Sequence, residues 1–142
     1  MVQGINIHKQ FNGLDILKGV DIHIRAGEVV SIVGSSGAGK TTLLTILGTL
    51  DRPTGGEVKL NEESVFALPD RKLAAFRNRH IGFVFQFHQL LPEFTALENV
   101  AIPSLIARES KKEAFDRAKT LLEELNLAER ADHKPSQLSG GE

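Results

Sequence analysis

The sequence has no cysteine among its 142 residues, so neither a disulfide framework nor a thiolate metal site can form. It also has no apolar run of the length needed to span a bilayer. Its first residues lack a basic start followed by an apolar block, which argues against a secretory signal. The net charge is only −1, so no overall basic field favours nucleic acid as a partner. We therefore expect a cytoplasmic chain that works at a membrane only through a partner's spanning helices.

The composition, 41% hydrophobic and 25% charged, is that of a soluble domain with a core of its own. Up to about Gln86 the pattern predicts an α/β arrangement of short strands and helices. Continuous or alternating apolar residues between glycine turns predict the strands, and apolar residues at helical spacing predict the helices, with Asp70 as a cap. The predicted strands are 5–11, 20–28, 28–34, 55–60 and 81–85, and the predicted helices are 41–50 and 70–79.

After Gln86 the pattern is helical only. Thr95 with Glu98, and Ser110 with Glu113, match the capping box that opens a helix. Pro103 should kink or end the first of these helices. The second carries one apolar stripe, made of Phe115, Ala118, Leu121, Leu122 and Leu125.

The strongest local pattern is Gly-x-x-x-x-Gly-Lys-Thr, which follows an apolar run and precedes an amphipathic helix. Glycines allow the backbone to wrap closely around phosphates, and the helix start adds free N–H groups and partial positive charge. A lysine adds a full charge, and a threonine hydroxyl is an oxygen ligand suited to Mg²⁺. The alternative is a Gly-Ser turn that merely precedes a helix. The predicted phosphate-binding loop comprises Gly34, Ser35, Ser36, Gly37, Ala38, Gly39, Lys40, Thr41 and Thr42.

Three further stretches narrow the class of P-loop protein. "LSGGE" at 138–142 resembles the signature sequence of ATP-binding cassette (ABC) ATPases, "IGFVFQ" ending at Gln86 resembles their Q-loop, and Phe11 matches their adenine-stacking aromatic. The order of these matches along the chain is also that of the family. The resemblance implies a P-loop NTPase core of ABC type with an N-terminal antiparallel β portion and a helical subdomain. We expect residues 1–86 to form part of the nucleotide-binding core and residues 87–142 an incomplete helical subdomain.

The resemblance also implies roles for these residues, with ATP and Mg²⁺ as substrate and cofactor. Phe11 would stack on adenine, Thr41 and Gln86 would hold Mg²⁺, and Lys40 and Gln86 would act on the reacting phosphate and water. The signature would contact the γ-phosphate held by a second ATPase subunit, which implies a head-to-tail homodimer. Its contacts would come from Ser139, Gly140 and Gly141.

Each of these positions also has a purely structural interpretation. Phe11 could be buried on an edge strand, Gln86 could be a polar strand terminus, and residues 139–142 could be an ordinary capped helix. The basic segment 71–80 reads better as a solvated helix face than as a surface for lipid headgroups or nucleotide.

The stretch 83–105 resembles the lipoprotein-releasing (Lol-type) branch of the family, whose close relatives are the macrolide-export and cell-division types. Four apolar residues follow the glutamine there, namely Phe87, Leu90, Leu91 and Phe94. They predict either a groove for a helix of a permease subunit or the core of the helical subdomain. The resemblance places the protein at the cytoplasmic face of the inner membrane, bound to the transmembrane permease subunits.

Some parts that the family requires are missing from the 142 residues. No apolar strand ends in Asp-Glu, and all five histidines (His8, His23, His80, His88 and His133) precede the signature. We therefore expect the sequence to be the N-terminal part of a longer ATPase, poorly stable and nearly inactive alone. The alternatives are a truncated ATP-binding module without catalysis and, less well matched, a P-loop kinase.

Overall fold

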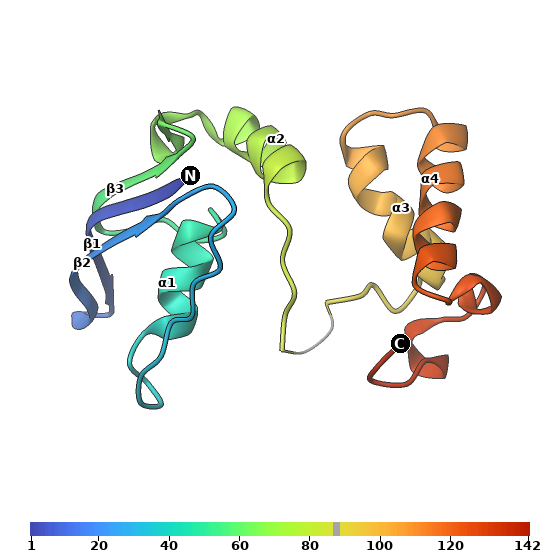
Figure 1. Cartoon of the computed structure of the whole chain (residues 1–142), viewed down its shortest axis with the longest axis horizontal. Coiled ribbons are helices and arrows are strands. Elements are labelled where there is room, and N and C mark those ends of the chain that lie inside the picture. Colours follow the sequence, from blue (N-terminus) through green and yellow to red (C-terminus); the bar gives the residue numbers. More distant parts are fainter. Residues whose placement is uncertain (87–88) are drawn as a thin grey trace. The chain divides into compact units, whose positions relative to one another are not determined.

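The computed structural model describes residues 1–86 and 89–142, so Phe87 and His88 lie outside the described residues. The chain divides into two compact units, Met1–Ile81 and Gly82–Glu142, and each is described by itself (Figure 1). The predicted boundary after Gln86 separates the nucleotide-binding core from the helical subdomain, which is not the same as a division into compact units. It therefore stays a prediction. Within the described ranges, no helix is both long and apolar enough to traverse a bilayer.

The first unit is built on an antiparallel sheet with the strand order β2-β1-β3-β4. Its strands are β1 (Val2–Phe11), β2 (Leu14–Ile24), β3 (Gly55–Leu60) and β4 (Glu63–Ser64). The strands predicted at 5–11, 20–28 and 55–60 are therefore confirmed, with the second ending before a turn at 26–27. The antiparallel β portion implied by the family resemblance is present.

A two-residue turn joins β1 to β2. Asn12 and Gly13 have φ values of 48° and 84°, as a type I′ hairpin turn requires. The turn sets Phe11 directly opposite Leu14 as the last pair of the ladder. The position of Phe11 at the end of β1 therefore follows from the Asn-Gly pair.

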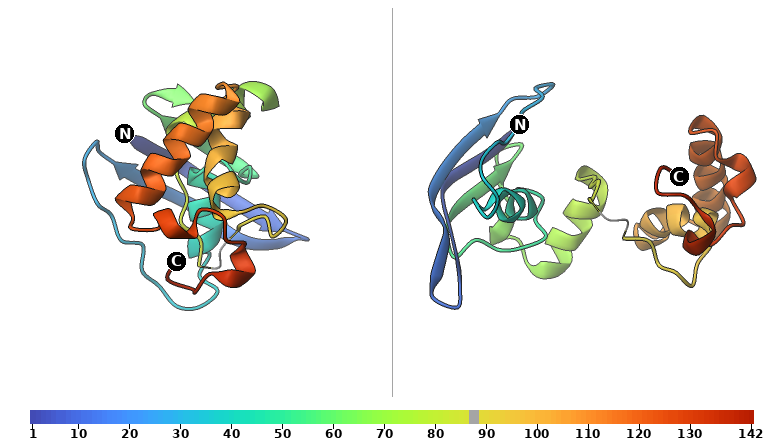
Figure 2. Two further views of the ribbon diagram at one scale, coloured as in Figure 1. Left: turned by 90° about the vertical axis from the view of Figure 1, so that its right-hand side faces the viewer. Right: turned by 90° about the horizontal axis from the view of Figure 1, so that it is seen from below.

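The helix α1 (Lys40–Leu47) packs on one face of this sheet (Figure 2). Its buried side chains are Leu43, Ile46 and Leu47, and Ile46 has no exposed surface. The core that they share with the sheet and the following segments comprises Ile7, Leu17, Leu43, Ile46, Leu47, Val58, Leu60, Val65 and Leu73. Each fully buried aliphatic side chain of this kind contributes roughly 1.5–3 kcal/mol, so the packing fixes the direction in which α1 points.

Two predicted strands do not form. Residues 28–34, expected to be buried on both faces, have no regular structure, and Val29 and Val33 are 97% and 85% exposed. Residues 81–85 are also irregular, with Val84 fully exposed. A strand needs a neighbour to pair its N–H and C=O groups. None of the four strands β1–β4 pairs with either segment, which is the physical reason for both errors.

The helix α2 (Asp70–His80) follows a 3-10 turn, η1 (Val65–Ala67). The prediction that Asp70 caps this helix is wrong, because Pro69 occupies the cap position and Asp70 is the first helical residue. The Asp70 carboxylate instead accepts from the Arg52 guanidinium at 2.7 Å. Its negative charge in the first turn still stabilises the helix, because it lies near the positive end of the helix dipole.

The second unit is helical, as predicted from the sequence. It comprises α3 (Ala96–Ile106), α4 (Lys111–Glu124) and the 3-10 turns η2 (Ala128–Arg130) and η3 (Pro135–Gln137). Both predicted capping boxes are formed, with Thr95 and Ser110 as the N-caps. Pro103 lies inside α3, which continues to Ile106 and therefore does not end at the proline.

The core between α3 and α4 is made of small residues. Ala101, Ala114 and Ala118 are at most 1% exposed, with Leu97, Val100 and Phe115 packed around them. The predicted stripe on α4 is only partly correct, because Leu121 and Leu125 are 43% and 68% exposed. The inward-facing row of α4 is made of Ala114, Ala118 and Leu122.

The start of α3 is joined to the segment that precedes the C-terminal residues. The N–H of Ala96 donates to the carbonyl of His133 at 2.8 Å, and the N–H of Leu97 donates to the carbonyl of Ala131 at 2.9 Å. Helix N-termini have N–H groups without partners in the helix, and these two bonds satisfy some of them.

The start of α1 depends on a glycine in the left-handed region. Gly39, the N-cap, has φ 85°. A Cβ atom there would lie 2.9 Å from Leu17 Cδ2 and 3.2 Å from the carbonyl oxygen of Ile16. The position is therefore restricted both by its backbone conformation and by the contact between α1 and β2.

We predict that Gly39→Ala destabilises the protein more than Gly13→Ala. The two glycines have nearly the same φ, 85° and 84°, but a Cβ atom added at Gly13 would meet no described atom within 4 Å. The left-handed penalty of about 1–2 kcal/mol is therefore common to both, and the steric overlap adds about 1–3 kcal/mol at Gly39 alone. Urea denaturation of the two variants measures the difference. Equal free energies of unfolding would contradict the close packing of Gly39 on β2.

Candidate functional site

The predicted phosphate-binding loop, residues 34–42, begins at the end of the irregular segment 28–35 and continues into the first turn of α1, whose first residue is Lys40. The Lys40 ammonium folds back over the loop and donates to the carbonyl oxygens of Gly34 at 2.9 Å and Ser35 at 2.6 Å. The strand predicted before the loop is absent, but the helix after it is present. The loop and its lysine are therefore brought together by α1.

All but one of the backbone N–H groups of the loop have no backbone acceptor outside a helix among the described residues. Within the described residues, the one backbone bond inside the loop runs from the Ala38 N–H to the Ser35 carbonyl, at 3.3 Å. The N–H groups in the first turn of a helix have no acceptor within the helix, and α1 begins at Lys40. Residues 34–38 and Thr41 are exposed. Solvent-accessible N–H groups, a helix start and a lysine ammonium together suit a polyanion.

The residues predicted to hold Mg²⁺ are described in different units. Thr41 is the second residue of α1 in the first unit, and its exposed side chain carries a hard oxygen of the type Mg²⁺ takes as a ligand. Gln86 belongs to the second unit and is exposed. Their joint role in binding Mg²⁺ stays a prediction.

Phe11 lies at the end of β1 and is 48% exposed, so it is not a buried edge-strand residue. One contact of its ring is with the Lys9 ammonium, whose Nζ lies 4.7 Å from the ring centroid. A half-exposed ring can accept a flat base, as the sequence predicts. Its role in stacking stays a prediction.

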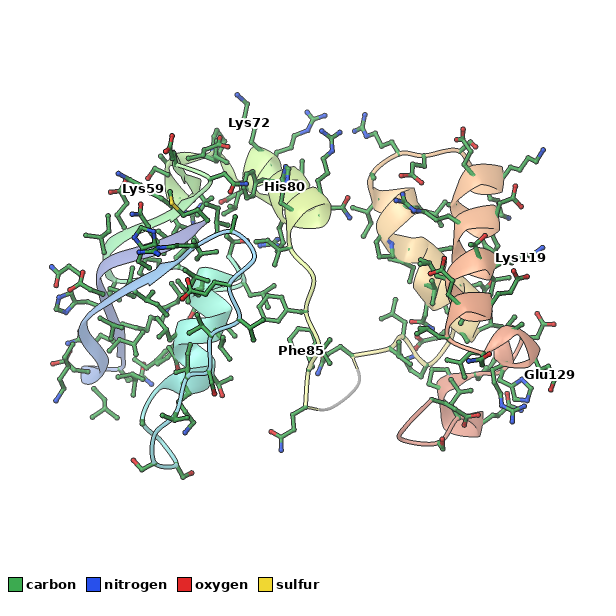
Figure 3. The ribbon with its side chains drawn as sticks, in the orientation of Figure 1. Lys59, Lys72, His80, Phe85, Lys119 and Glu129 are labelled. Atoms are coloured by element: carbon green, nitrogen blue, oxygen red, sulfur yellow. The ribbon has the colours of Figure 1, made fainter. Side chains whose placement is uncertain are left out.

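The second unit contains a cavity of about 670 Å³ lined by Gln86 and by residues of the signature stretch. Phe83 and Phe85 stack beside Gln86, with ring centroids 5.1 Å apart (Figure 3 labels Phe85). The residues that line the cavity are Phe83, Val84, Phe85, Gln86, Gln89, Leu90, Pro135, Leu138, Ser139, Gly140, Gly141 and Glu142. Residues of two different motifs, the stretch ending at Gln86 and the signature stretch, therefore line one cavity.

The predicted apolar cluster is half-exposed in its described part. Leu90, Leu91 and Phe94 are 39%, 45% and 40% exposed, so they are not the closed core of the unit. Asn99 holds this segment in place. Its side chain accepts from the Leu91 N–H at 2.8 Å and donates to the carbonyls of Leu91 and Phe94 at 3.1 and 3.2 Å.

The signature stretch forms the reciprocal bonds of a capping box. The Ser139 N–H donates to Glu142 Oε2 at 2.7 Å, and the Glu142 N–H donates to Ser139 Oγ at 3.4 Å. Gly140 and Gly141 lie between them, exposed and with no described atom near the place of a Cβ. The loop thus presents bare backbone between two fixed ends.

Arg130 completes the fixing of the signature stretch. Its Nε donates to Glu142 Oε1 at 2.7 Å. This bond, together with the bonds from Ser139, lowers the pKa of Glu142 from 4.5 to about 2. Arg130, Lys9 and Asn99 were not predicted as site residues, because each bonds a residue distant in sequence or a backbone carbonyl, and no motif marks such contacts.

Comparison with known proteins supports one family throughout. Residues 17–142 match the ABC transporter family. The chain is 61% identical over its whole length to the lipoprotein-releasing system ATP-binding protein LolD of Porphyromonas gingivalis, and 58% identical over 96% of its length to LolD of Cytophaga hutchinsonii. It also aligns with a solved dimeric ATP-binding cassette, MJ0796 bound to ADP and Pi. That alignment has a TM-score of 0.90 at 42% identity and covers 99% of this chain.

The chain is shorter than these relatives. It spans 65% of the P. gingivalis protein, 63% of the C. hutchinsonii protein and 64% of the cassette chain. The matches nevertheless cover both units, from the sheet to the signature stretch.

We predict that Arg130→Met raises the pKa of Glu142 toward 4.5, because its strongest hydrogen-bond partner is removed. A carboxylate with a lowered folded-state pKa stabilises the fold above about pH 4.5, and that contribution is lost as the pH falls toward 2. Carboxyl-carbon NMR titration measures the pKa directly. Arg117→Met is the matched control, since Arg117 pairs with Glu109 and not with the signature. An unchanged titration of Glu142 in Arg130→Met would contradict the assigned contact.

Proposed function

Because the chain belongs to the ABC transporter family, we propose that it is the ATP-binding portion of an ATPase subunit that powers lipoprotein release from the inner membrane. The relatives at 61% and 58% identity carry the name of that system. They favour lipoprotein release over the macrolide-export and cell-division branches considered from the sequence. The subunit would act at the cytoplasmic face, bound to transmembrane permease subunits.

The observation that carries this proposal is the loop before α1. Its lysine is the first residue of the helix, and two of its carbonyls accept from that lysine at 2.9 and 2.6 Å. Apart from the Ala38 N–H, which donates to the Ser35 carbonyl, its backbone N–H groups have no backbone acceptor among the described residues. Such a loop binds the phosphates of a nucleotide rather than its sugar or base.

Residues of the first unit, together with Gln86 of the second, would bind different parts of ATP and its Mg²⁺. Lys40 would leave its carbonyl partners for the β- and γ-phosphates, where it offsets charge that grows in the transition state. The N–H groups of Gly37 to Thr42 would hold the phosphates, and Phe11 would stack on the adenine. Bound Mg²⁺ supplies further neutralisation of the phosphate charge, and the Thr41 hydroxyl and the Gln86 amide oxygen would hold it.

Residues of the second unit would contact two partners, a second ATPase subunit and the permease. Ser139, Gly140 and Gly141 offer a hydroxyl and bare N–H groups, which suit the γ-phosphate of ATP bound to a second ATPase subunit. This arrangement requires a head-to-tail homodimer, and the solved cassette MJ0796 is described as a dimer. The half-exposed residues Leu90, Leu91 and Phe94 would contact a helix of the permease.

We predict that Lys40→Ala weakens ATP binding by about 10- to 100-fold, because a charged hydrogen-bond partner of the phosphates is lost, worth about 1.5–3 kcal/mol. Equilibrium titration of the intact ATPase with a fluorescent ATP analogue measures the affinity. Lys119→Ala is the matched control, because Lys119 lies on α4 in the other unit and far in sequence from the loop (Figure 3). An unchanged affinity in Lys40→Ala would remove the basis of the proposal.

We further predict that a polypeptide of residues 1–142 alone hydrolyses ATP negligibly. Its sequence has no strand ending in Asp-Glu to polarise water, and the segment 28–34 that precedes the loop pairs with none of the strands β1–β4. A phosphate-release assay on a mass-verified sample measures the rate, with the intact protein as the reference. Rapid turnover by the shorter polypeptide would show that other groups activate the water.

A further inference from the structure

Lys9 is the most deeply buried charged side chain among the described residues. The residue is 8% exposed, whereas lysine is almost never buried without a partner. Its ammonium forms an ion pair with the Asp51 carboxylate at 2.7 Å and donates to the carbonyl oxygen of Arg52 at 2.7 Å. These bonds connect β1 to the residues that follow α1.

The same ammonium also contacts an aromatic ring. Lys9 Nζ lies 4.7 Å from the centroid of Phe11, two residues further along β1. A cation near a ring face is attracted to it, and the attraction is stronger when the cation is shielded from water. The Lys9 ammonium is already bonded to the Asp51 carboxylate and the Arg52 carbonyl, so its position does not depend on the ring. The attraction therefore favours one position of the Phe11 ring.

The contact connects two parts of the candidate site. Asp51 and Arg52 lie just after α1, the helix that begins with Lys40. A base and a triphosphate belong to one ligand, so the ring and the loop must keep a fixed separation to bind both. A side chain that is already ordered loses less freedom when its ligand arrives.

We propose that Lys9 is a positioning residue for the nucleotide base: it holds the Phe11 ring at a fixed place relative to α1. This inference rests on the proposed function, in which Phe11 stacks on adenine. Lys9 itself touches no part of the nucleotide in this arrangement. Its effect on binding passes through the ring.

The competing interpretation is that Lys9 only stabilises the first unit through its ion pair with Asp51. The two differ in which ligands they affect. Loss of a general support of the fold would weaken every ligand of the loop, whereas loss of ring positioning would weaken only ligands that carry a base. Inorganic tripolyphosphate has the phosphates without the base and separates the two.

The experiment uses the intact ATPase and measures the affinities for ATP and for inorganic tripolyphosphate by calorimetry. We expect Lys9→Met to weaken ATP binding about three- to tenfold and to leave tripolyphosphate binding within about twofold. Methionine keeps the length and apolar stem of lysine without its charge. Lys59→Met is the matched control, because Lys59 lies on β3 of the same sheet and pairs with Glu57 instead of holding the Phe11 ring (Figure 3).

A double-mutant cycle with Phe11→Ala tests the route of the effect. In the Phe11→Ala background, Lys9→Met should cause no further loss of ATP affinity. Combining Lys9→Met with Asp51→Asn removes the carboxylate that Lys9→Met alone leaves unpaired, and provides a folded comparison if Lys9→Met alone does not fold. Asp51→Asn alone is the reference for this combination.

Three results would overturn the inference: equal losses for ATP and tripolyphosphate, the same loss with and without Phe11, or no loss at all in Lys9→Met. Two other variants, Phe11→Ala and Lys40→Ala, test the proposed function separately. If Phe11→Ala leaves ATP affinity unchanged, the stacking role is wrong and Lys9 has nothing to position. If Lys40→Ala leaves both ligands unchanged, the loop itself is not the phosphate site.

Discussion

The burial of one face of α1 against the antiparallel sheet is the constraint on which the candidate site depends. Leu43, Ile46 and Leu47 place the helix, and the contact of Gly39 with β2 sets how closely its first turn approaches. The loop at residues 34–38 is itself exposed and makes few bonds of its own. The position of the loop is therefore set by the apolar packing of α1 on the sheet, and this packing does not use the polar groups that could bind a ligand.

Polar side chains also support the loops of the candidate site. Lys40, Glu142 and Asn99 each bind backbone groups of a loop and hold that loop in one shape. Glycine-rich loops lose much conformational freedom when they are ordered. A charged or amide side chain that bridges the loop offsets part of that cost before a nucleotide or partner arrives. In the two glycine loops of the candidate site, Lys40 and Glu142 are these side chains, and Asn99 bridges the segment 91–94, which contains no glycine.

Local signals in the sequence predicted local structure well. The capping boxes at Thr95 and Ser110 and the helix that begins at Lys40 depend on neighbours within a few residues, and all three are confirmed. The strands predicted at 5–11, 20–28 and 55–60 also form, because each has a pairing partner in the sheet. The strands predicted at 28–34 and 81–85 do not form. Their apolar residues are typical of a strand inside a sheet, and such a strand forms only when another strand pairs with it. The prediction that Asp70 caps α2 was wrong because Pro69 occupies the N-cap position and Asp70 is already the first helical residue.

The site was predictable where a motif marks it and unpredictable where long-range contacts complete it. The glycine and lysine spacing identified the loop before α1, and the Ser-Gly-Gly-Glu spacing identified the loop that Glu142 closes. The supports at Lys9 and Arg130 join positions 42 and 12 residues apart, and neither partner stands out in the sequence. No alternation or helical period reports such a pair, since it arises only when two elements come together.

The alanine seam between α3 and α4 has a mechanical consequence. Ala101, Ala114 and Ala118 have no rotamers to adjust, so at the centre of the contact a displacement of one helix is not taken up by side-chain repacking. The first N–H groups of α3 are also bonded to the carbonyls of Ala131 and His133. A displacement of the segment 91–94, which Asn99 holds, would therefore move α3 and α4 together as one rigid unit. The turn at 139–141 would move with them and would not become locally more flexible.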